Sequence, residues 1–127
     1  MAKKTPETEF VTIVSGSAEQ WARNKVVWAC NEMAKIVSDT HGNVSMRAGD
    51  LVFIKPSGVL YSKVDYNNIC IVRMKKDGTW TQVKLDEPEY ETLRPSVDTP
   101  HHVRIYRNNP EIKAICHTHT THVVAHA

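Results

Sequence analysis

The chain has 127 residues, of which 41% are hydrophobic and 24% charged, and this length and composition fit one soluble globular domain. A formal net charge of +2 gives no argument for binding to nucleic acid or to a membrane surface. The sequence has no apolar run long enough to span a bilayer, and the polar start "MAKKTPETEF" is unlike a secretory signal. We therefore expect a cytoplasmic protein, and three widely spaced cysteines favour a reducing compartment without a disulfide framework.

The first segment predicts an arm followed by a helix. Residues 1–14 are polar, with a short apolar run, and we expect a flexible N-terminal arm before a single domain over 15–127. Ser17 followed by Gln20 fits a capping box that opens a helix. Apolar residues then recur at helical spacing, at Ala22, Val26, Ala29, Cys30, Met33 and Val37. The turn-forming stretch "SDTHGN" predicts the end of this helix.

From Asn43 onward the pattern changes to short strands. The segments "NVSMR", "LVFIK", "NICIVRM" and "WTQVKL" predict four strands, with a hairpin through Asp77-Gly78 between the last two. Their number and the turns between them favour a sheet as the centre of the domain.

The last third of the chain predicts a return to helical structure. Thr99 before Pro100 predicts a second helix, on which His102, Ile105 and Tyr106 would share one face. "EIKAICHTH" predicts a further strand, and "TTHVVAHA" the first turns of a third helix. The order of elements predicts an α/β or α+β layered domain around a mixed sheet.

Four histidines gather at the end of the chain. His117 and His119 are spaced i, i+2, so on a strand both imidazoles project from one face and can chelate one divalent ion. The same spacing also fits two hydrogen-bonded histidines near a strand end. His122 and His126 are spaced i, i+4, but the intervening residues lack the glutamate of a zinc protease helix.

Two other features have both a structural and a functional interpretation. Asp98, just before the second predicted helix, can be a helix cap worth about 1 kcal/mol or a carboxylate ligand for a metal. The stretches "HGNVS" and "KPSGVLY" can be ordinary turns, or turns whose backbone N–H groups hold a phosphate with help from Lys55. Spacing alone does not choose between these alternatives.

Together, "GNVS", "IKPSGVLYS", "RPSVDTPHHVRIYR" and "IKAICHTHTTH" resemble the class II aldolase/adducin family. The blocks of that family, in order, are GN-[VI]-S, PSG-xx-Y, PS-x-[DE]-xxxH and HTH. The resemblance runs from about Val26 to Ala127. Within the family, Asp98 in the third block and a histidine three residues after HTH are similar to the L-ribulose-5-phosphate 4-epimerase branch.

The resemblance implies a central, mainly antiparallel sheet flanked by helices, and a homotetramer with active sites between subunits. It implies a divalent metal, Zn²⁺ or another such as Mn²⁺, bound by Asp98, His117 and His119, with Asp98 also catalytic. It also implies a set of residues that bind the phosphate of a sugar substrate, namely Gly42, Asn43, Lys55, Ser57, Gly58 and Ser96.

The activity implied is retro-aldol cleavage of a sugar phosphate followed by re-formation of the bond with inversion at C4, with the metal as Lewis acid. Alternatives are an aldolase or decarboxylase acting on another sugar or sugar acid, or a non-catalytic assembly module of the adducin type. Val97 and His41 replace a serine and a tryptophan of the epimerase branch, which argues for a different substrate end. Family members continue further and supply a third histidine and acid/base groups, so we expect residues 1–127 to be the N-terminal part of the domain, without turnover alone.

Overall fold

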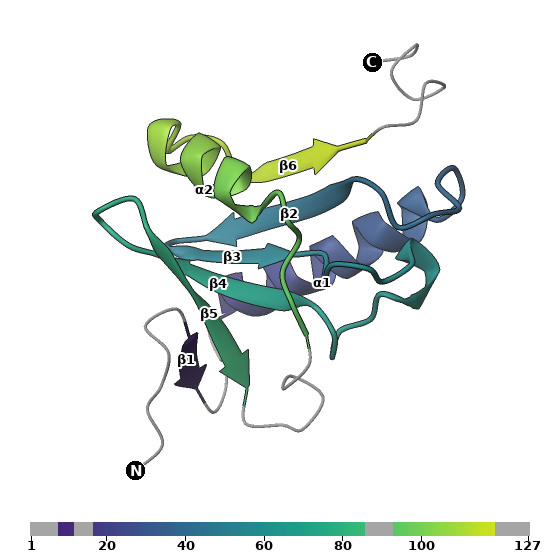
Figure 1. Ribbon diagram of the computed structural model, residues 1–127, viewed down its shortest axis with the longest axis horizontal. Helices are drawn as coiled ribbons and strands as arrows, with labels where there is room; N and C mark the ends of the chain where they lie inside the picture. Colours follow the sequence, from purple (N-terminus) through teal and green to yellow (C-terminus); the bar gives the residue numbers. More distant parts are fainter. Residues whose placement is uncertain (1–7, 12–16, 86–92, 119–127) are drawn as a thin grey trace.

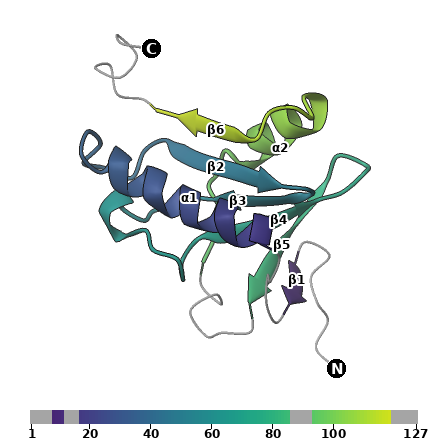
Figure 2. The same ribbon diagram turned by 180° about the vertical axis from the view of Figure 1, so that it is seen from behind.

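The computed structural model describes residues 8–11, 17–85 and 93–118 of the chain. Within these ranges, a six-stranded sheet with the order β1-β5-β4-β3-β2-β6 carries one helix on each face. Figure 1 looks onto the face that carries α2, and Figure 2 onto the face that carries α1. The elements in chain order are β1 (Thr8–Val11), α1 (Ser17–Met33), β2 (Asn43–Ala48), β3 (Leu51–Ile54), the short 3-10 helix η1 (Tyr61–Lys63), β4 (Cys70–Met74), β5 (Trp80–Leu85), α2 (Thr99–Asn108) and β6 (Ala114–His117).

The sheet is mainly antiparallel, as predicted. β2 pairs with β3 and β6, β4 pairs with β3 and β5, and all four pairings are antiparallel. The predicted hairpin joins β4 to β5, where Gly78 has the positive φ of 92° that such a turn favours. The layered α+β fold with a helix on each face of the sheet is therefore confirmed for the described residues.

The N-terminal segment differs from the prediction in one respect. Within the arm expected over residues 1–14, Thr8–Val11 form β1, which pairs in parallel with the end of β5 in the register Thr8 to Gln82. The other residues of the arm lie outside the described part of the chain. The division into an arm and a domain over 15–127 stays a prediction.

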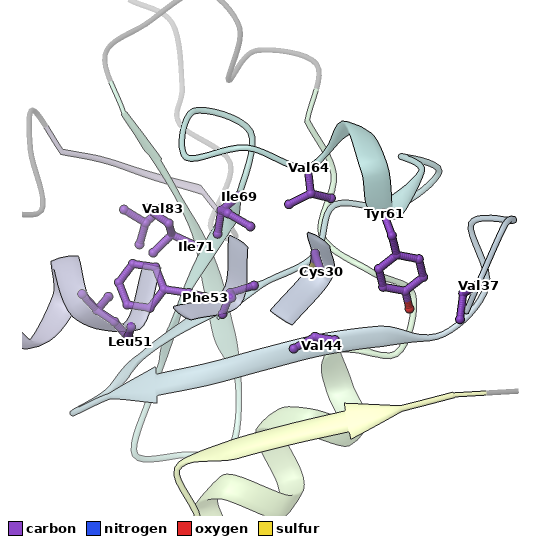
Figure 3. Packing of buried hydrophobic residues seen from close by; sticks show 12 residues of the cluster. Cys30, Val37, Val44, Leu51, Phe53, Tyr61, Val64, Ile69, Ile71 and Val83 are labelled. Atoms are coloured by element: carbon purple, nitrogen blue, oxygen red, sulfur yellow. The ribbon is translucent and has the colours of Figure 1, made fainter. Parts of the chain in front are cut away.

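The face covered by α1 holds the larger apolar cluster. The helical stripe predicted from sequence brings Ala22, Val26 and Cys30 against the sheet, and none of the three is exposed to solvent. Strand alternation directs Phe53 and Ile71 toward the same helix, and Figure 3 shows this packing. The helix ends at Met33 as an α-helix, and a turn in which Val37 N–H donates to Met33 O completes the predicted stripe.

The face covered by α2 holds a second cluster, and one sequence prediction fails there. Val103 and Tyr106 pack against this face with the strand residues Val52, Ile54, Cys70, Val72 and Met74. His102 is also buried, but Ile105 is 38% exposed, so it does not share their face. The buried stripe includes Val103, and Ile105 lies beyond the edge of a stripe centred there.

Three remaining expectations concern cysteines, membranes and the chain end. Cys30 and Cys70 are buried free thiols, whereas Cys116 is a free thiol on the exposed strand β6. Neither helix in the described ranges combines the length and the apolar character that a bilayer span needs. The helix predicted over the last eight residues, with His122 and His126, lies outside the described residues.

Candidate functional site

A pocket of about 520 Å³ lies at the end of the sheet where β2 begins and β6 ends. It gathers four segments that are far apart in the sequence, and its lining residues are Thr40, His41, Gly42, Asn43, Lys55, Pro56, Ser57, Gly58, Ser96, Val97, Asp98 and His117. Every site residue predicted from sequence lines this pocket except His119, which lies outside the described residues.

Strand pairing and one loop contact explain this convergence. The antiparallel register of β2 and β6 places Asn43 opposite His117. Lys55 follows directly after β3, whose last residue pairs within the same sheet. The segment before α2 is held against the residues after β3 by a bridge between Pro56 and Pro95 and by the bond from Ser57 N–H to Arg94 O, at 2.8 Å.

Asp98 is the acidic centre of the pocket. Its Oδ2 accepts a hydrogen bond from Asn43 Nδ2 at 2.8 Å and lies 3.0 Å from His117 Nδ1. The hydrogen bond from Asn43, and next the contact with His117, lower the pKa of Asp98, so the side chain is a carboxylate at neutral pH. Although Asp98 occupies the N-cap position of α2, its side chain makes no capping bond, so the carboxylate is directed to the pocket instead.

Lys55 places a buried cation at the same pocket. The residue is only 1% exposed, and its Nζ donates to Thr40 O and Pro56 O, each at 3.3 Å. The ammonium also lies 4.8 Å from the centroid of the Tyr61 ring, a favourable cation–π geometry. Burial is the main cause that lowers the pKa of Lys55. No carboxylate among the described residues forms an ion pair with this ammonium, and a desolvated ammonium attracts an anion strongly.

The two glycines of the pocket have positive φ for different reasons. Gly42 has φ 77°, and a Cβ there would lie 2.5 Å from His117 O, so this backbone approach needs glycine. Gly58 has φ 74° in an exposed turn, with no atom within 4 Å of a Cβ position. Gly42 therefore allows the start of β2 to approach the end of β6. At Gly58 the absence of a side chain leaves the turn open to solvent.

Part of the predicted anion cradle is absent. Ser45, inside the "HGNVS" stretch, is completely buried on β2 and does not line the pocket. The backbone N–H of Ser57 already donates to Arg94 O. The hydroxyl of Ser96 accepts from Asn43 Nδ2 at 3.0 Å and from the N–H of Asp98 at 3.2 Å. The hydrogen of that hydroxyl has no acceptor among the described residues, so it can be donated to a ligand.

The donor chemistry fits a divalent cation, but the described residues supply only part of a site. An imidazole and a carboxylate face each other at one wall, and both are ligands that zinc and manganese accept. No cluster of three or more His, Cys, Asp or Glu side chains occurs among the described residues. The third predicted ligand, His119, lies outside them, so the pair can be the described part of a larger ligand set.

Sequence reasoning missed a polar network that lies behind the pocket. Ser45, His102 and Tyr106 are all buried, and the hydroxyl of Ser45 is hydrogen-bonded to both His102 and Tyr106. The sequence places His102 on a helix face and at the last position of the third family block, PS-x-[DE]-xxxH, but assigns it no role. The spacing of Asp98 and His102, i to i+4 at the start of a helix, was the signal that could have pointed to it.

Several solved structures share this fold. The match to YgbL from Escherichia coli has a TM-score of 0.64 at 24% identity, covering 86% of this chain and 49% of that one. An L-fuculose 1-phosphate aldolase gives a TM-score of 0.65 at 22% identity, with 87% and 50% covered. The L-fuculose 1-phosphate aldolase from Glaciozyma antarctica PI12 gives 0.66 at 19% identity, with 91% and 47% covered. The chain thus spans about half the length of these structures.

A family comparison agrees with the shared fold. The family model described as "Class II Aldolase and Adducin N-terminal domain" matches residues 24–127. That range contains all four segments of the pocket and most of the sheet. By this match over most of its length, the chain belongs to the class II aldolase and adducin family.

Proposed function

We propose that the pocket binds a divalent cation and a phosphorylated sugar. The protein that carries it would cleave and re-form a carbon–carbon bond of that sugar, as an L-ribulose-5-phosphate 4-epimerase does. One observation carries the proposal: four separate segments meet at one pocket, with a carboxylate beside an imidazole and a buried ammonium also lining it. Membership of the aldolase family supports the same class of chemistry.

Asp98, His117 and His119 are the proposed cation ligands. The carboxylate of Asp98 stays ionised at neutral pH, as a ligand must. A bound divalent cation would supply Lewis-acid polarisation of a sugar carbonyl. Asp98 is also the proposed catalytic residue, because its carboxylate lines the pocket in which the sugar would bind.

Lys55 and the serines form the proposed phosphate end. Lys55 provides the positive charge, and the hydroxyls of Ser57 and Ser96 provide hydrogen bonds. The turn at Gly58 leaves the backbone open to an anion, because no atom lies within 4 Å of a Cβ position there. Gly42 is assigned to this end from the resemblance alone. Asn43 was also assigned to this end from the resemblance, yet both hydrogens of its side-chain amide are donated inside the protein.

Cation binding is the first test. Calorimetric titration of the chain with Zn²⁺ and with Mn²⁺ should give one site per chain, and His117→Ala should remove it. His101→Ala is the matched control, because His101 is exposed on α2 and does not line the pocket. Equal binding by the wild type and the His117 variant would contradict the proposed ligand.

Product analysis is the second test. The chain, and any longer gene product that contains it, would be incubated with L-ribulose 5-phosphate, with L-fuculose 1-phosphate and with a phosphorylated sugar acid. An inverted pentulose phosphate supports the epimerase, two smaller fragments support an aldolase, and carbon dioxide release from a sugar acid supports a decarboxylase. If no divalent cation binds, the adducin-like assembly module becomes the better proposal. Homo-oligomeric assembly and a cytoplasmic location stay predictions.

A further inference from the structure

A line of buried polar side chains runs from α2 through β2 to the pocket. Ser45 Oγ lies 2.7 Å from the hydroxyl of Tyr106 and 2.7 Å from His102 Nδ1. His102 Nε2 contacts Asn43 Oδ1, and Asn43 Nδ2 donates to Asp98 Oδ2 at 2.8 Å. The residues before Asp98 in this line are at most 2% exposed, namely Tyr106, Ser45, His102 and Asn43. Water therefore does not compete for their hydrogen bonds.

The donors and acceptors of Asn43 fix the direction of its hydrogen bonds at the pocket end of this line. The amide nitrogen of Asn43 has two hydrogens, and it donates them to Asp98 and to Ser96 Oγ. The amide oxygen of Asn43 must therefore be the atom that accepts from His102. This requires a hydrogen on Nε2 of the imidazole.

The rest of the line follows from a neutral imidazole. Burial lowers the pKa of His102 to about 4, so its Nδ1 is a lone-pair acceptor at neutral pH and takes the hydroxyl hydrogen of Ser45. Burial also raises the pKa of Tyr106 to about 12, so Tyr106 keeps its hydrogen and donates it to Ser45 Oγ. Every donor in the line then has one acceptor.

We propose that Tyr106, Ser45 and His102 are positioning residues, which fix the orientation of the Asn43 amide so that Asn43 holds the Asp98 carboxylate beside His117. The two ends of an amide have nearly the same shape, so packing alone does not decide which end faces Asp98. A flipped Asn43 would set its oxygen against a carboxylate and its N–H groups against His102 Nε2–H. The imidazole thus excludes the flipped amide.

The consequence for the cation rests on the proposed function, but the positioning itself does not. Mutation of residues that hydrogen-bond to a metal ligand and orient it typically lowers metal affinity about 10- to 100-fold. We therefore separate two measurements. The first measures the hydrogen bonds of the relay, by which we mean Tyr106, Ser45, His102 and Asn43, in the cation-free protein. The second measures the affinity of the pocket for Zn²⁺.

The first measurement is nuclear magnetic resonance of the cation-free chain. The imidazole of His102 should be in the Nε2–H tautomer, and the side-chain amide hydrogens of Asn43 should be protected from exchange. His102→Gln keeps an N–H group near the position of Nε2 and should retain the protection. His102→Asn carries its amide near the position of Nδ1, does not reach Asn43, and should lose the protection.

A control and a second variant keep the test decisive if one protein folds poorly. Val103→Ala removes apolar volume next to His102, at a residue 2% exposed, without touching the relay, and should retain the protection. Ser45→Ala removes the acceptor and donor at the middle of the line. It should leave His102 in a mixture of tautomers.

The second measurement is calorimetric titration with Zn²⁺. Affinity should fall at least 10-fold for His102→Asn and Ser45→Ala, and less than 3-fold for His102→Gln and Val103→Ala. The proposal is overturned if wild-type His102 is the Nδ1–H tautomer. It is also overturned if Val103→Ala reduces the protection of Asn43 as much as His102→Asn does. If the relay signals are as expected but the wild type binds no Zn²⁺, the positioning role stands and the proposed function fails.

Discussion

The two faces of the sheet bury different kinds of side chain. Opposite α1, the cluster around Phe53 and Ile71 is apolar in its centre (Figure 3). Opposite α2, the apolar cluster continues into the buried polar residues Ser45 and His102. The pocket lies at the end of the sheet beyond both clusters, and each face contributes to it: Lys55 extends the strand alternation of the α1 face, and Asn43 that of the α2 face.

This difference separates stabilisation from positioning. Apolar burial stabilises a fold in proportion to area and has little directional preference. A buried polar group costs free energy unless it is hydrogen-bonded, but its bonds have fixed directions. The α1 face therefore contributes mainly stability, whereas the α2 face also fixes the orientation of groups that reach the pocket through Asn43 and Asp98.

The largest expected effect comes from breaking the α1 face. Phe53 is completely buried against α1, so Phe53→Ala should lower the free energy of unfolding by about 4 kcal/mol, through lost burial and the cavity left behind. Val52→Ala, on the same strand but facing α2, removes fewer buried atoms and should cost about 2 kcal/mol. Urea denaturation at neutral pH measures both. A loss well below about 3 kcal/mol for Phe53→Ala would contradict its complete burial against α1.

The next largest effect on the free energy of unfolding comes from protonating His102 on the α2 face. His102 titrates near 6.5 when unfolded, and burial lowers its pKa to about 4 in the folded protein. The unfolded chain thus binds the proton more readily, so the stabilisation is complete above pH 6.5 and is lost as the pH falls toward 4. The shift corresponds to a loss of about 3 kcal/mol at most across this window.

Urea denaturation at several pH values between 4 and 7 measures this loss. The charge of Asp98 opposes the shift, and the charges of His117 and His101 add to it. His102→Gln removes the titrating group, so the difference between wild type and variant isolates its contribution from those of other carboxylates and histidines. Parallel pH profiles for the two proteins would show that His102 is not buried in its neutral form.

Local patterns predicted most of the fold. The apolar stripe of α1 and the alternation in β2 to β5 each need only neighbouring residues, and the structure has these elements where the sequence placed them. β1 was missed because its pairing with β5 joins residues about seventy positions apart, and a four-residue strand has no period of its own. Ile105 was misplaced because helical spacing allowed two adjacent stripes, and only the contact of Val103 with the sheet selects one of them.

The site divides in the same way. The resemblance of four short blocks identified the residues that line the pocket, and the structure brings the described ones together. It could not indicate that the amide hydrogens of Asn43 are already used, or that Ser45 faces α2 rather than a ligand. Both facts depend on which residues of β2 face which residues of α2. That arrangement is set by packing across the whole sheet and not by any short motif.

The smallest effects compare the two glycines at the rim of the pocket, where the faces meet. Any L-residue at Gly42 or Gly58 must adopt a left-handed φ, of 77° or 74° respectively, which costs about 1 kcal/mol. Gly58→Ala should cost only this amount, because no atom lies within 4 Å of the new Cβ. Gly42→Ala should cost about 2 kcal/mol, because its Cβ would lie 2.5 Å from His117 O and the backbone must shift.

The same pair of variants also separates the cation end of the pocket from its anion end. The shift forced by Gly42→Ala moves the backbone of His117, so the affinity for Zn²⁺ should fall together with stability. Gly58→Ala leaves His117 in place and should not change that affinity, although it can weaken binding of inorganic phosphate. Thermal unfolding measures the stabilities, and titrations with Zn²⁺ and phosphate measure the two ends. Equal loss of Zn²⁺ affinity in both variants would mean that the close contact between Gly42 and His117 does not hold the imidazole in place.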